Sequence, residues 1–440
     1  MKKILILLVA VVVIIGLVKC YNIEDDFIDS SGEYLLKPAA EEVKEDYALR
    51  NSDEYKSFME KLELFSARLT VEIYNNTDKS SNLSISPISV YMALAMTISG
   101  SNGSTKREML NAVGVTEEEV LAFTKHLYSY TNSVYYDGAE KVAAISELSN
   151  SIWIDNNIRL KEKGINVLAE SFNADSYYVP FYDDNATANQ AFADYVKSKS
   201  RGLIEQPASL LKKETLFVLV NTYYMKEVWN EYGDDLKSTK EQYDFKNDDG
   251  SMIKKTLLKS PYTIGKMYET ESYSHYYAQT DHGYKIKFIV PKDGYTLKDV
   301  FTVDNLVNIN SINSYAKDWE EGYQYNTRVL FPAFEAEYSK DIKPILEDKF
   351  NIRALFATGC DMSNLSDEDM ICSGIIHQSK LKVDESGIEG AALTYVAMEG
   401  NTAGPLAIDV YLDYIVDRAF GYVLTDYSGT ILFSGVVNTL

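Results

Sequence analysis

Helix-like and strand-like patterns occupy different parts of this chain, and this separation limits the folds open to it more than any other feature. Apolar residues recur at near-helical spacing over 58–74, and Ser86-Pro87 starts a second helix through Met96. A further helix is expected over 188–199. Runs typical of strands come later, at 216–220, 284–290, 408–416, 420–425 and 430–437. Neither regular βαβ alternation nor an internal repeat is present, so the pattern predicts one interlocked α+β domain with large mixed or antiparallel sheets.

The charge of the chain narrows the class of partner. Its 440 residues include 43 basic and 65 acidic side chains, which give a formal net charge of -22. Such a charge opposes approach to phosphate backbones and anionic lipid surfaces, so neither nucleic acid nor heparin is an expected partner. Cationic proteins, basic proteases among them, would instead be attracted.

The first residues have the composition of an export signal. The basic start Met1-Lys2-Lys3 precedes an apolar run over 4–18, which is short for a membrane span. Cys20 ends a segment similar to a bacterial lipoprotein cleavage box, except that Lys19 stands where a small residue is expected. Lipidation of Cys20, cleavage that releases a free protein, and an uncleaved membrane anchor are all open for segment 1–20. Each of them places the body outside the cytoplasm.

An acidic segment follows the export signal. Residues 21–57 are polar with little apolar periodicity, which predicts a flexible arm without a core. The folded domain is therefore expected over 58–440.

The motifs of common enzyme classes are missing from the sequence. The four histidines do not occur at metal-ligand spacing, and no G-x-S-x-G, G-x-x-x-x-G-K or G-x-G-x-x-G motif is present. These absences argue against a zinc hydrolase and make an enzyme less expected, although an unfamiliar site stays open. An unrelated secreted enzyme that uses some of the many carboxylates is the remote alternative.

Three cysteines are too few for a disulfide scaffold. Cys360 and Cys372 flank the acidic stretch 361–369 and could pair in an oxidising compartment. The alternative is two buried thiols.

Several segments resemble the serpin family, and they occur in the order of that family. The segments are 82–89 (NLSISPIS), 93–96 (ALAM), 100–105 (GSNGST), 219–226 (LVNTYYMK) with Trp229, 331–334 (FPAF), 417–420 (DRAF) and 429–435 (GTILFSG). Any one of them would be a weak signal, whereas all of them in family order are not expected by chance. The resemblance extends over about 58–440. It implies a serpin fold, in which helices pack around a large central β-sheet, smaller sheets accompany it, and a reactive-centre loop is exposed.

The resemblance also gives roles to polar residues of the core. Ser86, Ser89, Asn221 and His377 match the family's shutter, a hydrogen-bonded cluster where two central strands part to admit another. Trp229 matches the aromatic residue at the breach, the upper end of the same sheet. From the residues alone, the two serines could equally cap a helix, and Trp229 could be an ordinary core residue.

Segment 383–394 resembles the serpin hinge, at the start of a bait loop expected over about 385–404. The hinge residues are Glu385, Gly387, Ile388, Glu389, Gly390, Ala391 and Ala392. A loop that enters a sheet must alternate its side chains between the two faces and keep charge off the core face. The core set is Ile388, Gly390, Ala392, Thr394, Val396 and Met398, whereas Glu389 and Glu399 fall in the opposite set. The alternation therefore favours insertion.

The hinge departs from the family in places. The family prefers a small residue where Ile388 stands, alanine where Gly390 and Leu393 stand, and glycine where Glu227 stands. Glycine weakens a strand, so these departures keep a non-inhibitory surface or binding protein of the same fold open as an alternative.

The resemblance implies suicide inhibition of a serine protease, or else of a cysteine protease, by a monomer that has no catalytic residue, metal or cofactor of its own. Counting from the hinge puts the cleaved bond at Asn401-Thr402, within the range Ala397 to Ala403. Neither Arg nor Lys occurs over 383–417, so an elastase-, chymotrypsin- or subtilisin-like target is favoured over a trypsin-like one.

Overall fold

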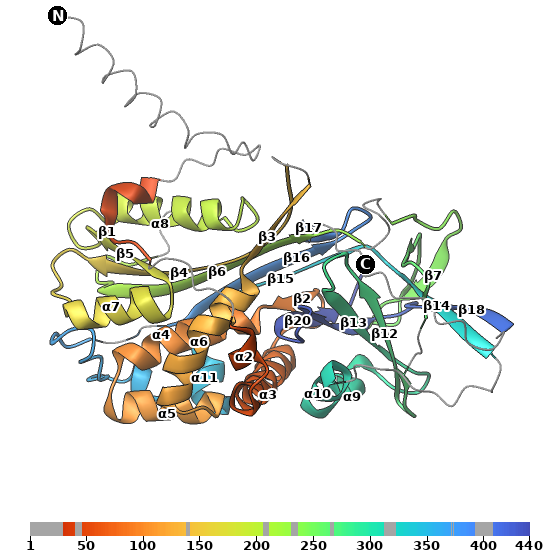
Figure 1. The fold of residues 1–440 in the computed structure, drawn as a ribbon, viewed down its shortest axis with the longest axis horizontal. Coiled ribbons are helices and arrows are strands. Elements are labelled where there is room, and N and C mark those ends of the chain that lie inside the picture. The colour runs from red at the N-terminus through yellow and green to blue at the C-terminus, as the bar shows by residue number, and fades with distance from the viewer. Residues whose placement is uncertain are drawn as a thin grey trace, which may run out of the picture.

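The computed structural model describes residues 30–39, 46–137, 141–205, 211–229, 236–264, 268–311, 323–370, 372, 374–391 and 408–440. Within them the chain forms one large sheet, smaller sheets, and helices packed against both faces of the large sheet (Figure 1). This arrangement confirms the predicted α+β class. No helix among these residues is long and apolar enough to cross a bilayer.

The large sheet has the strand order β1-β5-β4-β6-β17-β16-β15, and β3 pairs with β4 beside this path. Its strands are β1 (Leu35–Lys37), β3 (Ser133–Asp137), β4 (Lys141–Asp155), β5 (Ala174–Val179), β6 (Phe217–Glu227), β15 (Phe334–Asp341), β16 (Ile376–Val383) and β17 (Ile388–Ala391). Neighbouring strands are antiparallel except for the parallel pair β4 and β5.

Smaller sheets lie toward one end of the large sheet, and β2 of the six-stranded one packs against β15 and β16 (Figure 1). One has the order β11-β12-β13-β19-β20-β2, one has the order β10-β14-β18 with β9 paired to β14, and β7 and β8 form a hairpin. Their bounds are β2 (Leu83–Ile85), β7 (Tyr243–Lys246), β8 (Met252–Lys255), β9 (Leu258–Lys259), β10 (Thr263–Ile264), β11 (Tyr268–Glu269), β12 (Tyr273–Gln279), β13 (Lys285–Pro291), β14 (Tyr323–Phe331), β18 (Ile408–Ile415), β19 (Phe420–Thr425) and β20 (Ile431–Val437). The strands predicted over 408–437 are therefore confirmed.

Several helices begin where the sequence supplies a capping side chain or a proline. Ser52 accepts a hydrogen bond from the Tyr55 amide at the start of α3, and Pro87 occupies the first turn of α4. The helices are η1 (Ser30–Tyr34), α2 (Tyr47–Arg50), α3 (Asp53–Asn75), α4 (Pro87–Gly100), α5 (Gly103–Val113), α6 (Glu117–Thr131), α7 (Glu162–Ser171), α8 (Asn185–Lys199), α9 (Leu297–Val300), α10 (Val303–Ser311), α11 (Lys343–Lys349) and η2 (Ala354–Phe356).

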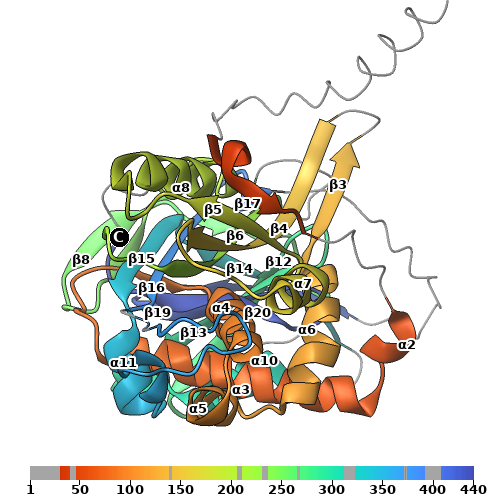
Figure 2. The same ribbon diagram turned by 90° about the vertical axis from the view of Figure 1, so that its left-hand side faces the viewer.

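Two apolar cores hold the large sheet between helices. On one face α8 covers β4 and β5 (Figure 2). Between them the Trp153 ring stacks on Tyr177 at 4.4 Å between centroids. On the other face α4, nearly all of it buried, packs against β6 and continues into the main core. A helix that is apolar all round is typical of a domain centre, so α4 is fixed from every side.

The acidic arm contains more structure than the sequence predicts. Residues 30–37 form η1 and β1, and Leu35 of β1 pairs with Tyr177 at the edge of the large sheet. Ser31 and Tyr55 are buried, so the expectation that 21–57 lacks a core is wrong for its described part. The segment pairs through backbone hydrogen bonds, which need no apolar periodicity in the sequence.

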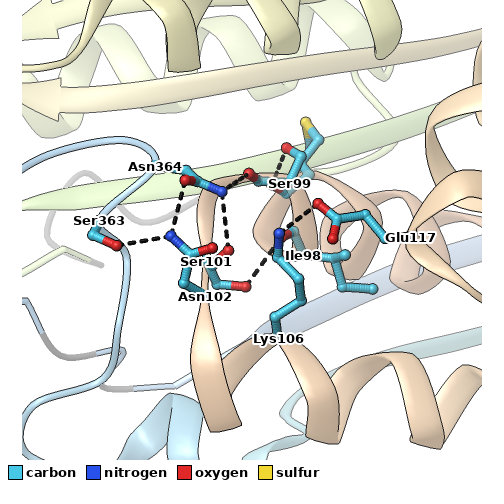
Figure 3. A network of polar contacts seen from close by, with 9 residues as sticks. Ile98, Ser99, Ser101, Asn102, Lys106, Glu117, Ser363 and Asn364 are labelled. Carbon is cyan, nitrogen blue, oxygen red and sulfur yellow. Dashed lines mark hydrogen bonds and ion pairs between the residues drawn. The ribbon is translucent and has the colours of Figure 1, made fainter.

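The turn after α4 is tied to the acidic stretch 361–369. The Asn102 side-chain amide donates to the Ser363 hydroxyl at 2.8 Å and to Asn364 Oδ1 at 2.9 Å (Figure 3). The Asn364 amide in turn donates to the carbonyl groups of Ser99 and Ser101, both at 3.1 Å. The last carbonyls of the helix are thereby satisfied, which explains why polar residues gather in this part of the family motif.

Gly435 sets the spacing between β20 and β2. A Cβ atom at this position would lie 1.8 Å from the Leu83 carbonyl oxygen, which is far inside van der Waals contact. Gly32, by contrast, has nothing within 4 Å of such an atom.

We predict that Gly435→Ala destabilises the protein by about 1–3 kcal/mol, because the added methyl group forces the two strands apart. The urea midpoint of the purified variant measures this effect. Gly32→Ala is the matched control and is expected to keep the wild-type midpoint; equal midpoints for the two variants would contradict the prediction.

Candidate functional site

The hinge forms a tight turn at the upper end of the large sheet. After β16 ends, the Asp384 amide donates to the Gly387 carbonyl at 2.9 Å, and the Gly387 amide donates back at 3.3 Å. The Ser386 amide and hydroxyl both donate to Asp384 Oδ1, at 2.8 and 2.6 Å. The chain therefore reverses within a few residues and returns as β17 between β16 and β6.

Gly387 allows this return because it lies against the neighbouring strand. A Cβ atom there would sit 1.9 Å from the Glu227 carbonyl oxygen, so no larger residue fits without moving β6. The next residue, Ile388, is fully buried and pairs with Glu227 on one side and Val383 on the other. Glu389 is half-buried, as expected for the opposite phase of the strand.

Trp229 packs next to the turn and donates a hydrogen bond to it. Its ring is fully buried, meets Phe331 edge-on at 5.4 Å, and its Nε1 donates to the Asp384 carbonyl at 2.7 Å. Glu385 is held as well, because its carbonyl accepts from the Leu236 amide at 2.7 Å. An indole that is otherwise surrounded by apolar groups needs such a partner, so the ring and the turn fix each other.

Asp384 is anchored electrostatically. Lys382 Nζ lies 2.6 Å from its carboxylate. Partial burial pushes the pKa of Asp384 up, but the hydrogen bonds from Lys382 and Ser386 outweigh burial and lower it. The carboxylate is therefore ionised near neutral pH and closes the turn as a charged acceptor.

A buried acid–imidazole pair lies beside the hinge, and the sequence did not indicate it. The Glu227 carboxylate is 3.0 Å from His282 Nδ1, with both side chains nearly inaccessible, and Tyr135 stacks on the imidazole at 3.8 Å. Burial raises the pKa of Glu227, while the hydrogen bond and charge of His282 oppose the rise. Glu227 is the last residue of β6, where it pairs with Ile388, and its side chain is buried.

Three of the four polar residues expected to cluster do so. The Ser86 amide donates to His377 Nε2 at 3.1 Å, and the hydroxyls of Ser86 and Ser89 are 3.0 Å apart. Ser86 makes no side-chain hydrogen bond to the helix start, so a capping role does not describe its hydroxyl. Burial lowers the pKa of His377 to about 4, which keeps the imidazole neutral and able to accept.

Asn221 is placed apart from this cluster. Its side-chain amide donates to Asn150 Oδ1 at 2.8 Å, and Asn150 donates to the Phe172 carbonyl at 2.6 Å. Asn221 Oδ1 is buried without a partner among the described residues. Such an acceptor is costly and indicates a place that another donor can fill.

Beyond the short pairing with β17, the edges of β6 and β16 that face each other form no strand pairing among the described residues. β17 pairs with Lys226 and Glu227 on β6 and with Lys382 and Val383 on β16. Over Phe217–Met225 the described pairing of β6 is with β4, and over Ile376–Leu381 that of β16 is with β15. The two strands thus present unpaired edges toward each other, and such edges are templates for a further strand.

Other sequence expectations fall elsewhere. Cys20, Ala392 and the bond range 397–403 lie outside the described residues. Cys360 and Cys372 are free thiols, and burial raises the pKa of Cys372 to about 11, so the pair is not bridged in this structure. Among the described residues no group of three or more His, Cys, Asp or Glu could hold a metal ion.

We predict that Trp229→Phe loosens the hinge, because phenylalanine keeps an aromatic ring but loses the donor to Asp384. The expected result is about a 5- to 10-fold faster amide hydrogen exchange over 384–391, since one buried hydrogen bond contributes about 1–1.5 kcal/mol.

Trp153→Phe is the matched control, because Trp153 is also buried and its Nε1 donates to Ser151 at 3.0 Å within β4. Exchange over 384–391 should stay at the wild-type rate in this variant. An equal increase in both variants would refute a specific role of Trp229.

We predict that acid weakens the fold through His377. Its folded pKa of about 4 lies below the unfolded value near 6.5, so the unfolded state binds more protons between these values and stability falls as pH falls. Between pH 7.5 and pH 5 this contributes a loss of about 2 kcal/mol, read from urea titrations. The His377→Gln variant should lose about 2 kcal/mol less stability than the wild type over this pH range. His275, whose pKa burial lowers to about 3, contributes equally in both proteins. An equal loss in wild type and variant would exclude His377 as the cause.

Comparisons with known proteins agree on a family. The chain matches the model described as serpin (serine protease inhibitor) over residues 60–440. It is 25% identical to human neuroserpin over 396 residues, covering 84% of this chain and 90% of that protein.

Two solved structures have a similar fold. Serpin48 of the insect Tenebrio molitor superposes with a TM-score of 0.70 at 20% identity, covering 89% of this chain and 100% of that chain. Human thyroxine-binding globulin superposes with a TM-score of 0.66 at 18% identity, covering 88% and 99%.

Proposed function

The chain belongs to the serpin family, and on that premise we propose that it is a suicide inhibitor of a serine protease. One observation carries this proposal: the hinge already enters the large sheet as β17, while the edges of β6 and β16 below it are unpaired within the described residues. A bait loop that begins as a strand between two strands with unpaired edges can continue between them once it is cut.

The proposed reaction starts on the bait loop. The protease serine oxygen attacks a carbonyl in the range Ala397 to Ala403, with Asn401-Thr402 as the first choice, and forms an ester while the peptide C–N bond breaks and the new amine leaves. The freed segment then inserts as a central strand and carries the ester-bound protease along, which distorts the protease before water can hydrolyse the ester. This protein supplies bait and strain, not catalysis.

The residues around the sheet support distinct roles in this reaction. Ser86, Ser89 and His377 would act as a shutter, with hydrogen bonds that must rearrange when the strands separate. Asn221 would join them in the inserted state, where an incoming strand can supply the donor that its Oδ1 lacks among the described residues. Trp229 would act at the breach by releasing the turn at Asp384 as insertion begins.

The target is inferred from the loop sequence. Segment 383–417 contains no Arg or Lys, which favours an elastase-, chymotrypsin- or subtilisin-like protease. Because the chain carries a net charge of -22, we also propose that this protease is basic.

The first residues support a site of action outside the cytoplasm. The basic start and the apolar run 4–18 have the pattern of an export segment, and Cys20 would be the lipidated residue if the protein is anchored. We propose an exported monomer, either released or held at a membrane.

The decisive test incubates the full chain with elastase-, chymotrypsin- and subtilisin-like proteases. We expect an SDS-stable covalent complex with at least one of them, and sequencing of the released C-terminal peptide identifies the bond. Cleavage without a complex and without a gain in thermal stability would instead support a non-inhibitory protein of the same fold.

A matched pair of substitutions tests insertion itself. We predict that Ala392→Glu raises the stoichiometry of inhibition at least 10-fold, because insertion would bury a carboxylate on the core face and slow down, which leaves time for hydrolysis. Ala391→Glu places the same side chain in the opposite phase and is expected to stay within twofold of wild type. Equal behaviour of the two variants would rule out an alternating inserted strand.

A further inference from the structure

The sheet that follows the bait loop carries an organised cluster of polar and aromatic side chains on its outer face. This cluster, called here the β14–β18 face, consists of Tyr262, Asn326, Arg328, Asp409, Tyr411 and Asp413. In β18 the exposed residues Asp409, Tyr411 and Asp413 alternate with half-buried Val410 and Leu412, so the three share the solvent side. Figure 1 places β14 and β18 at the end of the molecule opposite α8.

Half of the β14–β18 face is rigid. Arg328 Nε and Nη2 each donate to the Asp413 carboxylate at 2.7 Å, and the Tyr262 hydroxyl donates to the same carboxylate at 2.9 Å. The Arg328 guanidinium also lies 4.6 Å from the centre of the Tyr262 ring. Such a bidentate, stacked arrangement is ordered before any partner arrives, which reduces the entropy cost of binding.

The other half is available for contact. Tyr411 is 62% exposed and rests edge-on against the rigid Tyr262 ring at 5.1 Å. Asp409, two residues earlier on the same side, accepts from the Asn326 amide at 3.0 Å and forms no ion pair with a described residue. An exposed aromatic ring beside an uncompensated carboxylate is the chemistry that binds a Lys or Arg side chain.

The position of this face next to the bait loop limits what can occupy it. Asp409 follows residue 403 by six positions, so an extended chain separates them by at most about 21 Å. A protease–inhibitor contact buries about 800 Å² on each partner, a patch roughly 30 Å across. Such a patch reaches about 15 Å from the cleaved bond, so a protease seated on the loop contacts the first residues of β18 when the intervening chain is not fully extended.

We propose that the β14–β18 face is a second contact surface for the target protease and takes a Lys or Arg side chain from the rim of its cleft onto Tyr411 and Asp409. This proposal rests on the proposed function, because the loop brings the protease to this face. The net charge of -22 adds attraction for a basic partner at long range. The contact would accelerate encounter and select the protease without taking part in insertion.

The test uses whichever basic protease of the panel cleaves the loop. Tyr411→Ala and Asp409→Asn are each expected to lower the second-order rate of inhibition about 10-fold at low salt, and less at high salt, with an unchanged stoichiometry. Tyr182→Ala is the control, since Tyr182 is 55% exposed and precedes α8 at the other end of the molecule. Circular dichroism verifies that the variants fold. Wild-type rates for both β18 variants would overturn the proposal.

A second measurement separates this proposal from the proposed function. Binding of the full chain and its variants to the same protease with its catalytic serine replaced by alanine requires no covalent chemistry. Weaker binding by both β18 variants supports the contact surface even if no SDS-stable complex ever forms, in which case only the inhibitory function fails. Equal binding by all variants, with covalent complexes intact, removes the contact surface and leaves inhibition standing.

Discussion

The close approach of Gly387 to the Glu227 carbonyl is the contact on which the rest of the hinge depends. Because a Cβ atom there would lie 1.9 Å from that oxygen, the chain can return between β16 and β6 only with glycine at this position. The return places Ile388 in the core, aligns the Asp384 carbonyl with Trp229, and spreads the two long strands by the width of one strand. Backbone sterics at one residue therefore determine where the large sheet opens.

Polar groups buried along this opening raise the free energy of the folded sheet. Glu227 and His282 are paired out of solvent, Asn221 Oδ1 has no described partner, and His377 stays neutral because burial lowers its pKa. Each group costs desolvation energy that tight apolar packing would avoid. In the proposed mechanism, such groups raise the free energy of the native state relative to the state in which the cut loop has inserted.

Local patterns predicted much of this fold. The periodicity before Asn75 and the Ser86-Pro87 start placed α3 and α4, and apolar runs placed β18, β19 and β20. β4, the longest strand, was missed because serines and Glu147 interrupt its apolar pattern, and its central position rests on pairing with β6. The Glu227–His282 pair is separated by 55 residues, and no local pattern joins such residues. Family motifs located the hinge, but the bonds from Leu236 and Ser238 to Glu385 follow from tertiary packing alone.

The strand β1 joins the arm to the mechanics of the sheet. Its pairing with β5 makes residues 35–37 the outermost strand, at the edge away from β15. Tension applied through the N-terminal segment would therefore load the few backbone hydrogen bonds between β1 and β5, at the outer edge of the sheet that is proposed to widen. A tethered molecule and a released one would differ in this respect, since only the first would bear a pulling force at this edge of the sheet.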